Sequence, residues 1–297
     1  MSELADRITI VLLLHNCERW VGRTLDRLVE LELPIIAVDN ASRDGTRDVV
    51  ATYPDVTLLR LRDNIGAAGR NAGAALARTP YVAFCDDDGY FERSGLKYAA
   101  NALDAFPDIA VVNARIVVGP EQALDPISAE MQASPLQDTV PLPGKRLLGF
   151  MAGAIVVRRD AYLAVGGYSP AFFMGGEEET LAWPLVRRGW QLRYLPEVVV
   201  HHHPSLANFS RIRHFGIRNT LWNAWLHRPW PSAARYTGFI VRSSPKNRDL
   251  LRGLWLTARG LASVLHERRP VGDVLDRQLR LLEERRFRPP AETTGVM

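Results

Sequence analysis

Residues 81–88 read Tyr-Val-Ala-Phe-Cys-Asp-Asp-Asp. The first five are apolar, include β-branched and aromatic side chains, and follow Thr79-Pro80, which predicts a short buried strand. Three acids at the end of a strand repel one another, and their desolvation costs more still. A divalent cation relieves both problems, and ligands that are all oxygen favour Mg²⁺ or Mn²⁺, which can also neutralise a diphosphate. The alternative is a solvated acidic turn that caps the next helix.

The residues around this strand alternate between strand and helix patterns. Strands are expected at 8–14, 34–38, 56–61 and 81–85, and helices at 18–31, 46–53 and 66–78. This alternation predicts the α/β class, with a mostly parallel central sheet between two helical layers, an αβα sandwich. His15, Asp39, Asn64 and the acids at 86–88 all follow strands, and ligands bind at that edge of such sheets. We therefore expect the site there.

The second half of the chain has a weaker pattern. Further strands are expected at 154–157, 192–195 and 198–200, and helices from residue 210 to the end, with a break at 243–249. Residues 120–145 are rich in proline, which indicates either a loop on the acceptor side of a site or disorder. We expect a Rossmann-like catalytic domain over residues 1–204 and a helical extension over 205–297.

Composition limits the class of protein. With 297 residues and 47% hydrophobic content, the chain can bury a core without disulfides or structural metals. Cys17 and Cys85 lie in apolar, strand-like surroundings, so we expect reduced thiols and a cytoplasmic protein. The apolar run at 8–14 is too short to span a bilayer. Residues 1–6 lack the basic region of a signal peptide.

The net charge is +4, and 34 of the 37 basic residues are arginine, since the lysines are only Lys97, Lys145 and Lys246. The arginine fork fits phosphate oxygens, although codon bias is a sufficient alternative. A nucleic-acid partner would explain the charge. It would not explain the strand-end acids, which repel phosphate in the absence of a metal. We therefore expect no nucleic-acid partner.

Eight motifs follow one another in order: 8–16 (ITIVLLLHN), 38–46 (VDNASRDGT), 64–73 (NIGAAGRNAG), 84–88 (FCDDD), 166–168 (GGY), 172–179 (FFMGGEEE), 188–190 (RGW) and 201–203 (HHH). Together they resemble a family 2 glycosyltransferase of the GT-A fold, nearest to the bacterial rhamnosyl- and galactofuranosyl-transferase-like branch. The resemblance covers residues 8 to 205.

The resemblance implies an inverting enzyme that moves a sugar from a UDP-, dTDP- or GDP-sugar to a glycan or lipid-linked acceptor in cell-envelope glycan or glycoconjugate synthesis. It implies donor contacts from His15, Asp39, Asn64, Gly66, Arg70, Asp86 and Asp87. Asp39 would bind the nucleobase, or else cap a turn. Gly66 would let the backbone approach the nucleotide. Arg70 would meet phosphate, or else lie on a helix surface.

The resemblance also implies a metal site for Mg²⁺ or Mn²⁺. Asp86 and Asp88 match the outer acids of the family's DxD motif, and Asp87 would be a supporting or sugar-facing acid. His202 follows Glu178 by 24 residues (202 − 178), the interval at which related enzymes complete the metal site. Side chains alternate along a strand, so the neighbouring histidines should point to the opposite face from His202.

Inverting transfer needs a general base for the acceptor hydroxyl. Alignment on the family's Gly-Glu-Asp-like motif gives Glu178, with Glu177 as the alternative. Pro184 is compatible only with the first turn of a helix, so the helix should start near Glu179 or Thr180. Carboxylates are favourable at that end.

The segment Arg211–Arg228 mixes arginine and tryptophan with helical spacing. We expect it to pack on the catalytic domain with a solvated basic face. The alternative is peripheral contact with an anionic inner-membrane surface beside a lipid-linked acceptor. The oligomeric state is left open.

Two other functions compete with glycosyl transfer. A sugar-1-phosphate nucleotidyltransferase would need a glycine-rich first loop with a basic residue, which residues 15–18 (HNCE) do not supply. A non-catalytic nucleotide-sugar-binding protein would not need the whole set formed by Asp86, Asp88, Glu178 and His202.

Overall fold

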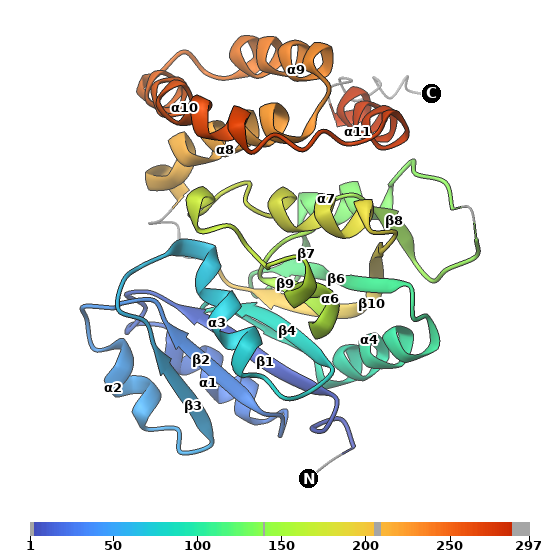
Figure 1. The fold of residues 1–297 in the computed structure, drawn as a ribbon. Helices are drawn as coiled ribbons and strands as arrows, with labels where there is room; N and C mark the ends of the chain where they lie inside the picture. The colour runs from blue at the N-terminus through green and yellow to red at the C-terminus, as the bar shows by residue number, and fades with distance from the viewer. Residues whose placement is uncertain (1–2, 139, 205–208, 287–297) are drawn as a thin grey trace, which may run out of the picture.

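The computed structural model describes residues 3–138, 140–204 and 209–286 (Figure 1). Its elements are, in order, β1 (Ile8–Leu14), α1 (Val21–Val29), β2 (Ile35–Asp39), α2 (Thr46–Ala51), β3 (Val56–Arg60), the 3₁₀ turn η1 (Gly66–Ala68), α3 (Gly69–Leu76), β4 (Tyr81–Asp86), β5 (Gly89–Phe91), α4 (Arg93–Ala105), β6 (Ile109–Val118), β7 (Ala123–Leu124), α5 (Pro126–Gln132), β8 (Lys145–Leu147), β9 (Ala154–Arg158), α6 (Arg159–Ala164), the 3₁₀ turn η2 (Pro170–Phe172), α7 (Glu179–Arg187), β10 (Gln191–His202), α8 (Phe209–His227), α9 (Trp230–Ser243), α10 (Arg248–His266) and α11 (Asp273–Arg286).

One curled sheet organises the N-terminal two thirds of the chain. Its strand order is β3-β2-β1-β4-β9-β6-β10-β5, with β7 and β8 paired at its margins. β1, β2, β3 and β4 are mutually parallel, and β6 and β10 share their direction. β9 runs antiparallel between β4 and β6. The mostly parallel sheet expected from the strand–helix alternation is confirmed.

Helices cover both faces of this sheet (Figure 1). Alternate residues of β1 enter two different cores. Ile8, Ile10 and Leu12 pack with α1 and α4, whereas Val11 and Leu13 pack with α3, α6 and α7. Because both faces are buried, the strand is apolar at every position. This is the physical reason that residues 8–14 read as one unbroken apolar run.

The small residues of α3 bring this helix against the sheet. A Cβ at Gly73 would lie 2.4 Å from Cγ1 of Val11 and 3.0 Å from Cγ2 of Val38, so position 73 has no room for a side chain. The helix expected at 66–78 is in fact η1 followed by the shorter α3.

Two expectations for the second half are wrong. Residues 192–195 and 198–200 belong to one strand, β10, which is interrupted by a register shift between Leu195 and Val199 where Pro196 removes a ladder donor. Residues 120–145 are not structureless, because they contain β7 and α5. The side chain of Asp125 caps α5 by accepting from Ile127 N at 2.8 Å, and Pro126 occupies the first helical turn.

The described residues of the loop after α5 are held by a buried arginine. Arg193 is fully buried in β10, donates to both carboxylate oxygens of Asp138 at 2.5 and 2.9 Å, and also donates to the backbone oxygens of Pro143 and Gly144. Arg193 lies near the start of β10 and His202 at its end, a separation of up to about 30 Å along an extended strand. The described residues of this loop are therefore tied to the end of β10 that is opposite His202, and an acceptor-side role for residues 120–145 stays a prediction.

Helices α8 to α11 form a layer over the sheet domain (Figure 1). The expected break at 243–249 falls between α9 and α10. In α8, His214, Arg218 and Asn223 are buried, which supports packing over membrane contact for this helix. Its basic face is only partly solvated, since Arg218 is 8% exposed. The expected domain boundary at 204/205 adjoins residues 205–208, which lie outside the described residues.

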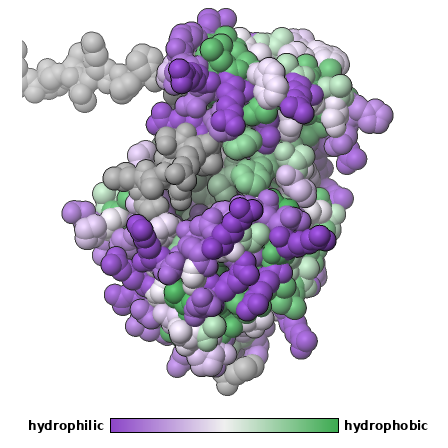
Figure 2. Space-filling view, turned by 90° about the vertical axis from the view of Figure 1, so that its left-hand side faces the viewer, coloured by the Kyte–Doolittle hydropathy of each residue, from purple (hydrophilic) through white to green (hydrophobic). Residues whose placement is uncertain are grey.

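Among the residues that the structure describes, no helix is both long and apolar enough to cross a bilayer. Figure 2 shows hydrophilic residues over much of the sheet domain and of the C-terminal helices, with a more apolar band between the two parts.

Candidate functional site

The three acids that end β4 point in different directions. Asp86 forms an ion pair with Arg70, and Asp88 Oδ1 lies 3.4 Å from Nε2 of His202. Asp87 is turned toward the segment before α1, where the Cys17 thiol and the Trp20 indole face its carboxylate. Arg70 and His202 therefore each offset the charge of one acid, and the raised pKa of Asp87 lowers the charge of the third. These acids therefore depend less on a metal than the sequence suggested.

Asp87 lies at the back of the site. Burial, with Asp88 and Asp86 adding to it, raises the pKa of Asp87 to about 7. Its backbone oxygen accepts from Thr24 Oγ1 at 2.8 Å, which ties the acidic turn to α1. This placement favours the supporting role for Asp87 over the sugar-facing one.

Arg70 is a buried residue of α3 at the site, and its side chain does not lie on the helix surface. It is 4% exposed, pairs with Asp86 and lies 5.8 Å from the centre of the Tyr168 ring. A buried guanidinium requires such a partner. Its Nε is buried with no hydrogen-bond partner among the described residues. The surface-arginine alternative is therefore wrong.

Gly153 is a site residue that the sequence analysis missed. A Cβ there would lie 2.1 Å from Oδ2 of Asp86, so only glycine leaves room for this carboxylate. The available signal was a glycine directly before β9, the strand that pairs with β4.

Three of the side chains predicted to contact the donor already form hydrogen bonds within the chain. Asp39 is fully buried, and it accepts from Ser42 N at 3.0 Å and from Arg47 Nε at 2.7 Å. This is the turn-capping arrangement that was the alternative to nucleobase binding, which stays a prediction. His15 is exposed, and its Nδ1 lies 2.9 Å from the backbone oxygen of Asn40. Asn64 Oδ1 accepts from the backbone N–H of residue 66.

Gly66 has to be a glycine because the backbone of Phe173 packs directly against it. Its φ is +62°, and a Cβ there would lie 2.0 Å from the backbone oxygen of Phe173. The next residue, Ala67, donates its N–H to the same oxygen at 2.7 Å. The absence of a side chain at Gly66 therefore makes room for the segment before Glu177 rather than for a ligand.

The three histidines separate as strand alternation predicted. His202 pairs with Gly89 across the β10–β5 ladder and so lies beside Asp88. The hydrogen bond to Asp88 raises the pKa of His202, against the opposing effect of burial. His201 and His203 both stack on Tyr90, and His201 Nε2 lies 2.9 Å from a carboxylate oxygen of Glu92. Of the three histidines, only the side chain of His202 faces the strand-end acid Asp88.

Asp88 and His202 are two side chains at this strand end that could bind a metal. Within the described ranges, no three His, Cys, Asp or Glu side chains are gathered closely enough to hold a metal ion by themselves. Asp88 and His202 present one oxygen and one nitrogen, and Mg²⁺ commonly completes such a set with phosphate oxygens and water. Asp86 is engaged by Arg70 instead. The pair Asp88–His202 fits a metal, while Asp86 as a ligand stays a prediction.

The second group of acids lies in residues 173–178, which we call the acid loop, directly before α7. The helix begins at Glu179, as predicted, but Pro184 lies inside it, so the expectation that this proline occupies the first turn is wrong. Burial raises the pKa of Glu177, which is 4% exposed and whose Oε2 has no partner among the described residues. Burial and the neighbouring Glu177 raise the pKa of Glu178 to about 8.

Arg70 connects the two groups of acids. Its charge acts on Asp86 and Glu177, and it lowers the pKa of Glu177 and Glu178 against the effect of burial. The structure therefore brings together the strand-end acids, His202 and the acid loop around one buried cation. A carboxylate whose pKa lies near neutral pH is suited to general-base catalysis.

Helix α8 contributes residues that the sequence analysis did not assign to the site. Arg218, Asn219 and Asn223 donate hydrogen bonds to backbone oxygens of residues 171–176. The only sequence signal was the polar and aromatic mixture of this helix.

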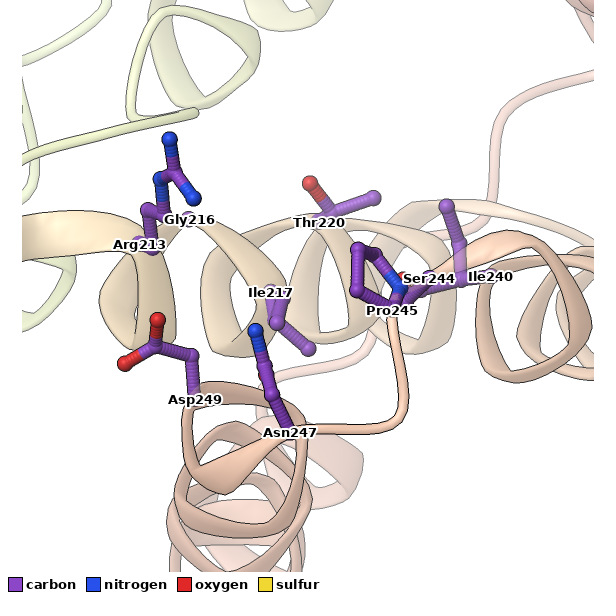
Figure 3. A pocket seen from close by; sticks show the side chains of 9 residues that line it. All are labelled: Arg213, Gly216, Ile217, Thr220, Ile240, Ser244, Pro245, Asn247 and Asp249. Carbon is purple, nitrogen blue, oxygen red and sulfur yellow. The ribbon is translucent and has the colours of Figure 1, made fainter. Parts of the chain in front are cut away.

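A cavity of about 470 Å³ opens between α8, α9 and α10 (Figure 3). Its lining includes Gly216 and Thr220 of α8. These two residues also meet the acid loop, because Cβ atoms built on Gly175 and Gly176 would lie 3.4 Å from Gly216 Cα and 3.7 Å from Thr220 Oγ1. The cavity therefore adjoins the acid loop.

Comparison with solved structures defines the fold class. GalNAc-T7, crystallised with UDP, GalNAc and Mn²⁺, superposes with a TM-score of 0.62 at 16% identity over 88% of this chain and 58% of that one. The αβα sheet with its helical extension is a GT-A glycosyltransferase fold. The match to the family model "Glycosyl transferase family 2" covers residues 9–166, and the chain belongs to that family.

Two proteins of Mycobacterium tuberculosis are similar in sequence. The pre-mycofactocin glycosyltransferase is 29% identical over 66% of this chain and 42% of its own length. The N-acetylglucosaminyl-diphospho-decaprenol L-rhamnosyltransferase is 26% identical over 64% of this chain and 72% of its own. The chain thus matches less than half the length of the first relative.

Proposed function

We propose that this chain is an inverting, metal-dependent glycosyltransferase that moves a sugar from a nucleoside-diphosphate sugar to an acceptor hydroxyl. One observation supports the proposal: the buried Arg70 pairs with Asp86 and interacts with Glu177, so the proposed diphosphate site adjoins the proposed base. Membership of the family supports the reaction class.

In this proposal the acceptor oxygen attacks the anomeric carbon while the bond from that carbon to the diphosphate breaks. Glu178 takes the proton of the attacking hydroxyl, and its raised pKa makes it a competent base. Glu177 is the alternative base. A single displacement of this kind inverts the anomeric configuration.

Asp88 and His202 would hold Mg²⁺ or Mn²⁺, and the bound ion would neutralise charge on the diphosphate leaving group. The Mn²⁺ and UDP named with GalNAc-T7 support this assignment, although that likeness concerns the fold. The donor is a UDP-, dTDP- or GDP-sugar that contacts His15, Asp39, Asn64, Gly66, Arg70 and Asp86, while Asp87 supports the acidic turn from behind.

The acceptor is proposed to be a glycan or a lipid-linked saccharide of cell-envelope synthesis. The name of the M. tuberculosis rhamnosyltransferase, with its diphospho-decaprenol acceptor, supports the lipid-linked case. A cytoplasmic enzyme that reaches the inner membrane through its basic C-terminal helices would fit such an acceptor. On α10, Leu251 and Trp255 are 69% and 57% exposed, and Arg259 lies 5.3 Å over the Trp255 ring.

A thermal-shift screen of nucleotide sugars, with Mn²⁺ and with EDTA, tests donor and metal together, because a ligand of the folded state raises the unfolding midpoint. Proton NMR of the product then gives the anomeric configuration. Retention would contradict the single displacement. Binding of nucleotide sugars without transfer to any acceptor would favour a non-catalytic binding protein. Release of pyrophosphate from a nucleoside triphosphate and a sugar 1-phosphate would indicate a nucleotidyltransferase.

A further inference from the structure

The acid loop takes its hydrogen bonds from the C-terminal helices. Nδ2 of Asn219 in α8 donates to the backbone oxygens of Phe172 at 2.7 Å and Gly175 at 2.6 Å. Nδ2 of Asn223, one helical turn further, donates to the oxygen of Gly176 at 2.7 Å. Both asparagines are fully buried. Without the asparagines, the carbonyls of Gly175 and Gly176 would lose these donors, and an unpaired buried acceptor costs about 1–3 kcal/mol.

The orientation of the Asn219 amide is determined by Arg218. Arg218 Nε donates to Oδ1 of Asn219 at 2.9 Å, so the amide nitrogen must face the loop. Arg218 also donates to the oxygen of Phe172 at 2.7 Å, and its guanidinium lies 4.4 Å from the centre of the Trp222 ring. The pair of adjacent side chains is therefore a rigid donor surface on α8.

The backbone of the acid loop depends on such support. Phe173, Gly175 and Gly176 have φ values of +60°, +82° and +75°, and positive φ is unfavourable for a phenylalanine. On the opposite side, the oxygen of Phe173 accepts from Ala67 N at 2.7 Å. The loop is thus held between η1 of the sheet domain and α8 of the helical layer, and Glu177 and Glu178 follow directly.

We propose that Asn219, assisted by Asn223, is a positioning residue for catalysis: it holds the acid loop so that Glu178 faces the acceptor hydroxyl. The inference rests on the proposed function, and it makes the C-terminal helices part of the catalytic unit. Asn219 acts through the backbone of residues 172–175 and does not itself touch the reacting atoms.

The test compares Asn219→Ala and Asn223→Ala with the control Thr237→Val in the full-length protein. Thr237 Oγ1 accepts from the Trp225 indole at 3.0 Å, so the control removes a bond between α8 and α9 without touching the loop. We expect Asn219→Ala to lower kcat about 10- to 100-fold, the scale of a small misplacement of a catalytic group. The Kd for the nucleoside diphosphate should change less than about twofold. Asn223→Ala should show a smaller loss in the same direction.

The pH profile separates positioning from simple destabilisation. Glu178 interacts with Glu177, Glu179, Arg70 and Tyr168, and burial is the largest influence on its pKa. A loosened loop admits water, so the rise of kcat with pH should move to lower pH in Asn219→Ala and stay unchanged in Thr237→Val. If Asn219→Ala does not fold, the same shift is required of Asn223→Ala.

Two kinds of failure can be distinguished. If the wild type transfers no sugar, or if Glu178→Gln is as active as the wild type, the proposed function or its base is wrong. If wild type and Glu178→Gln behave as proposed, but both asparagine variants match Thr237→Val in kcat and pH profile, the positioning role is overturned.

Discussion

Replacing Glu178 by glutamine tests the proposed base directly. The change keeps the size of the side chain and removes its ability to take a proton. General-base catalysis contributes about 10²–10⁴-fold, so kcat should fall by that factor. The Kd for the donor should hardly change, because the base acts on the acceptor. Glu179→Gln, one residue further into α7, is the matched control and should be mild.

The structure also gives the pH dependence. With a pKa of about 8, roughly one in ten Glu178 side chains is ionised at pH 7 and nine in ten at pH 9. The wild-type rate should therefore rise roughly tenfold over this interval, and the residual rate of Glu178→Gln should be flat.

A second consequence concerns stability. The folded-state pKa of Glu178 lies above its ordinary value of 4.5, so its contribution to stability is complete below that value and is lost as pH rises through about 8. Glu178→Gln should therefore gain in Tm relative to the wild type at pH 9 and not at pH 4.

Steady-state kinetics between pH 6 and 9, donor Kd by calorimetry and thermal unfolding check these points. If Glu178→Gln keeps a near-wild-type rate and Glu177→Gln is inactive, Glu177 is the base instead of Glu178. If neither variant loses more than a few-fold, the base lies outside the acid loop.

Three further predictions follow from particular contacts. Asp88→Ala should abolish metal-dependent binding of UDP or dTDP without unfolding the protein. Calorimetry in Mn²⁺ and in EDTA measures this binding. If the wild type binds equally well in EDTA, the proposed metal role is wrong. Gly153→Ala should weaken donor binding at least about tenfold, because the new Cβ would lie 2.1 Å from Asp86 Oδ2, whereas Gly149→Ala, with no atom within 4 Å, should be silent. Arg193→Ala should lower the free energy of unfolding by about 3–5 kcal/mol in urea titrations, since it leaves Asp138 and several buried carbonyls unpaired; a loss below 1 kcal/mol would contradict the role given to this residue.

The sheet domain was predictable because its signals are local. Each parallel strand is buried on both faces and is therefore a short apolar run, and each helix between strands has its own periodicity. The fold class, the ordered motifs and the separation of His202 from its neighbours all follow from these patterns. The strand β9 was expected at 154–157, but its antiparallel position between β4 and β6 has no local signal, because the pairing depends on the whole sheet.

The sequence by itself determined which side chains lie at the carboxyl edge of the sheet, because strand ends and side-chain alternation are properties of consecutive residues. Only the tertiary structure decided how those charges are balanced. Asp86 pairs with Arg70, Asp87 is buried against α1, and Asp88 pairs with His202. Likewise, the support of the acid loop by Asn219 links residues more than 40 positions apart. Such partners are selected by packing in three dimensions, and no local pattern encodes them.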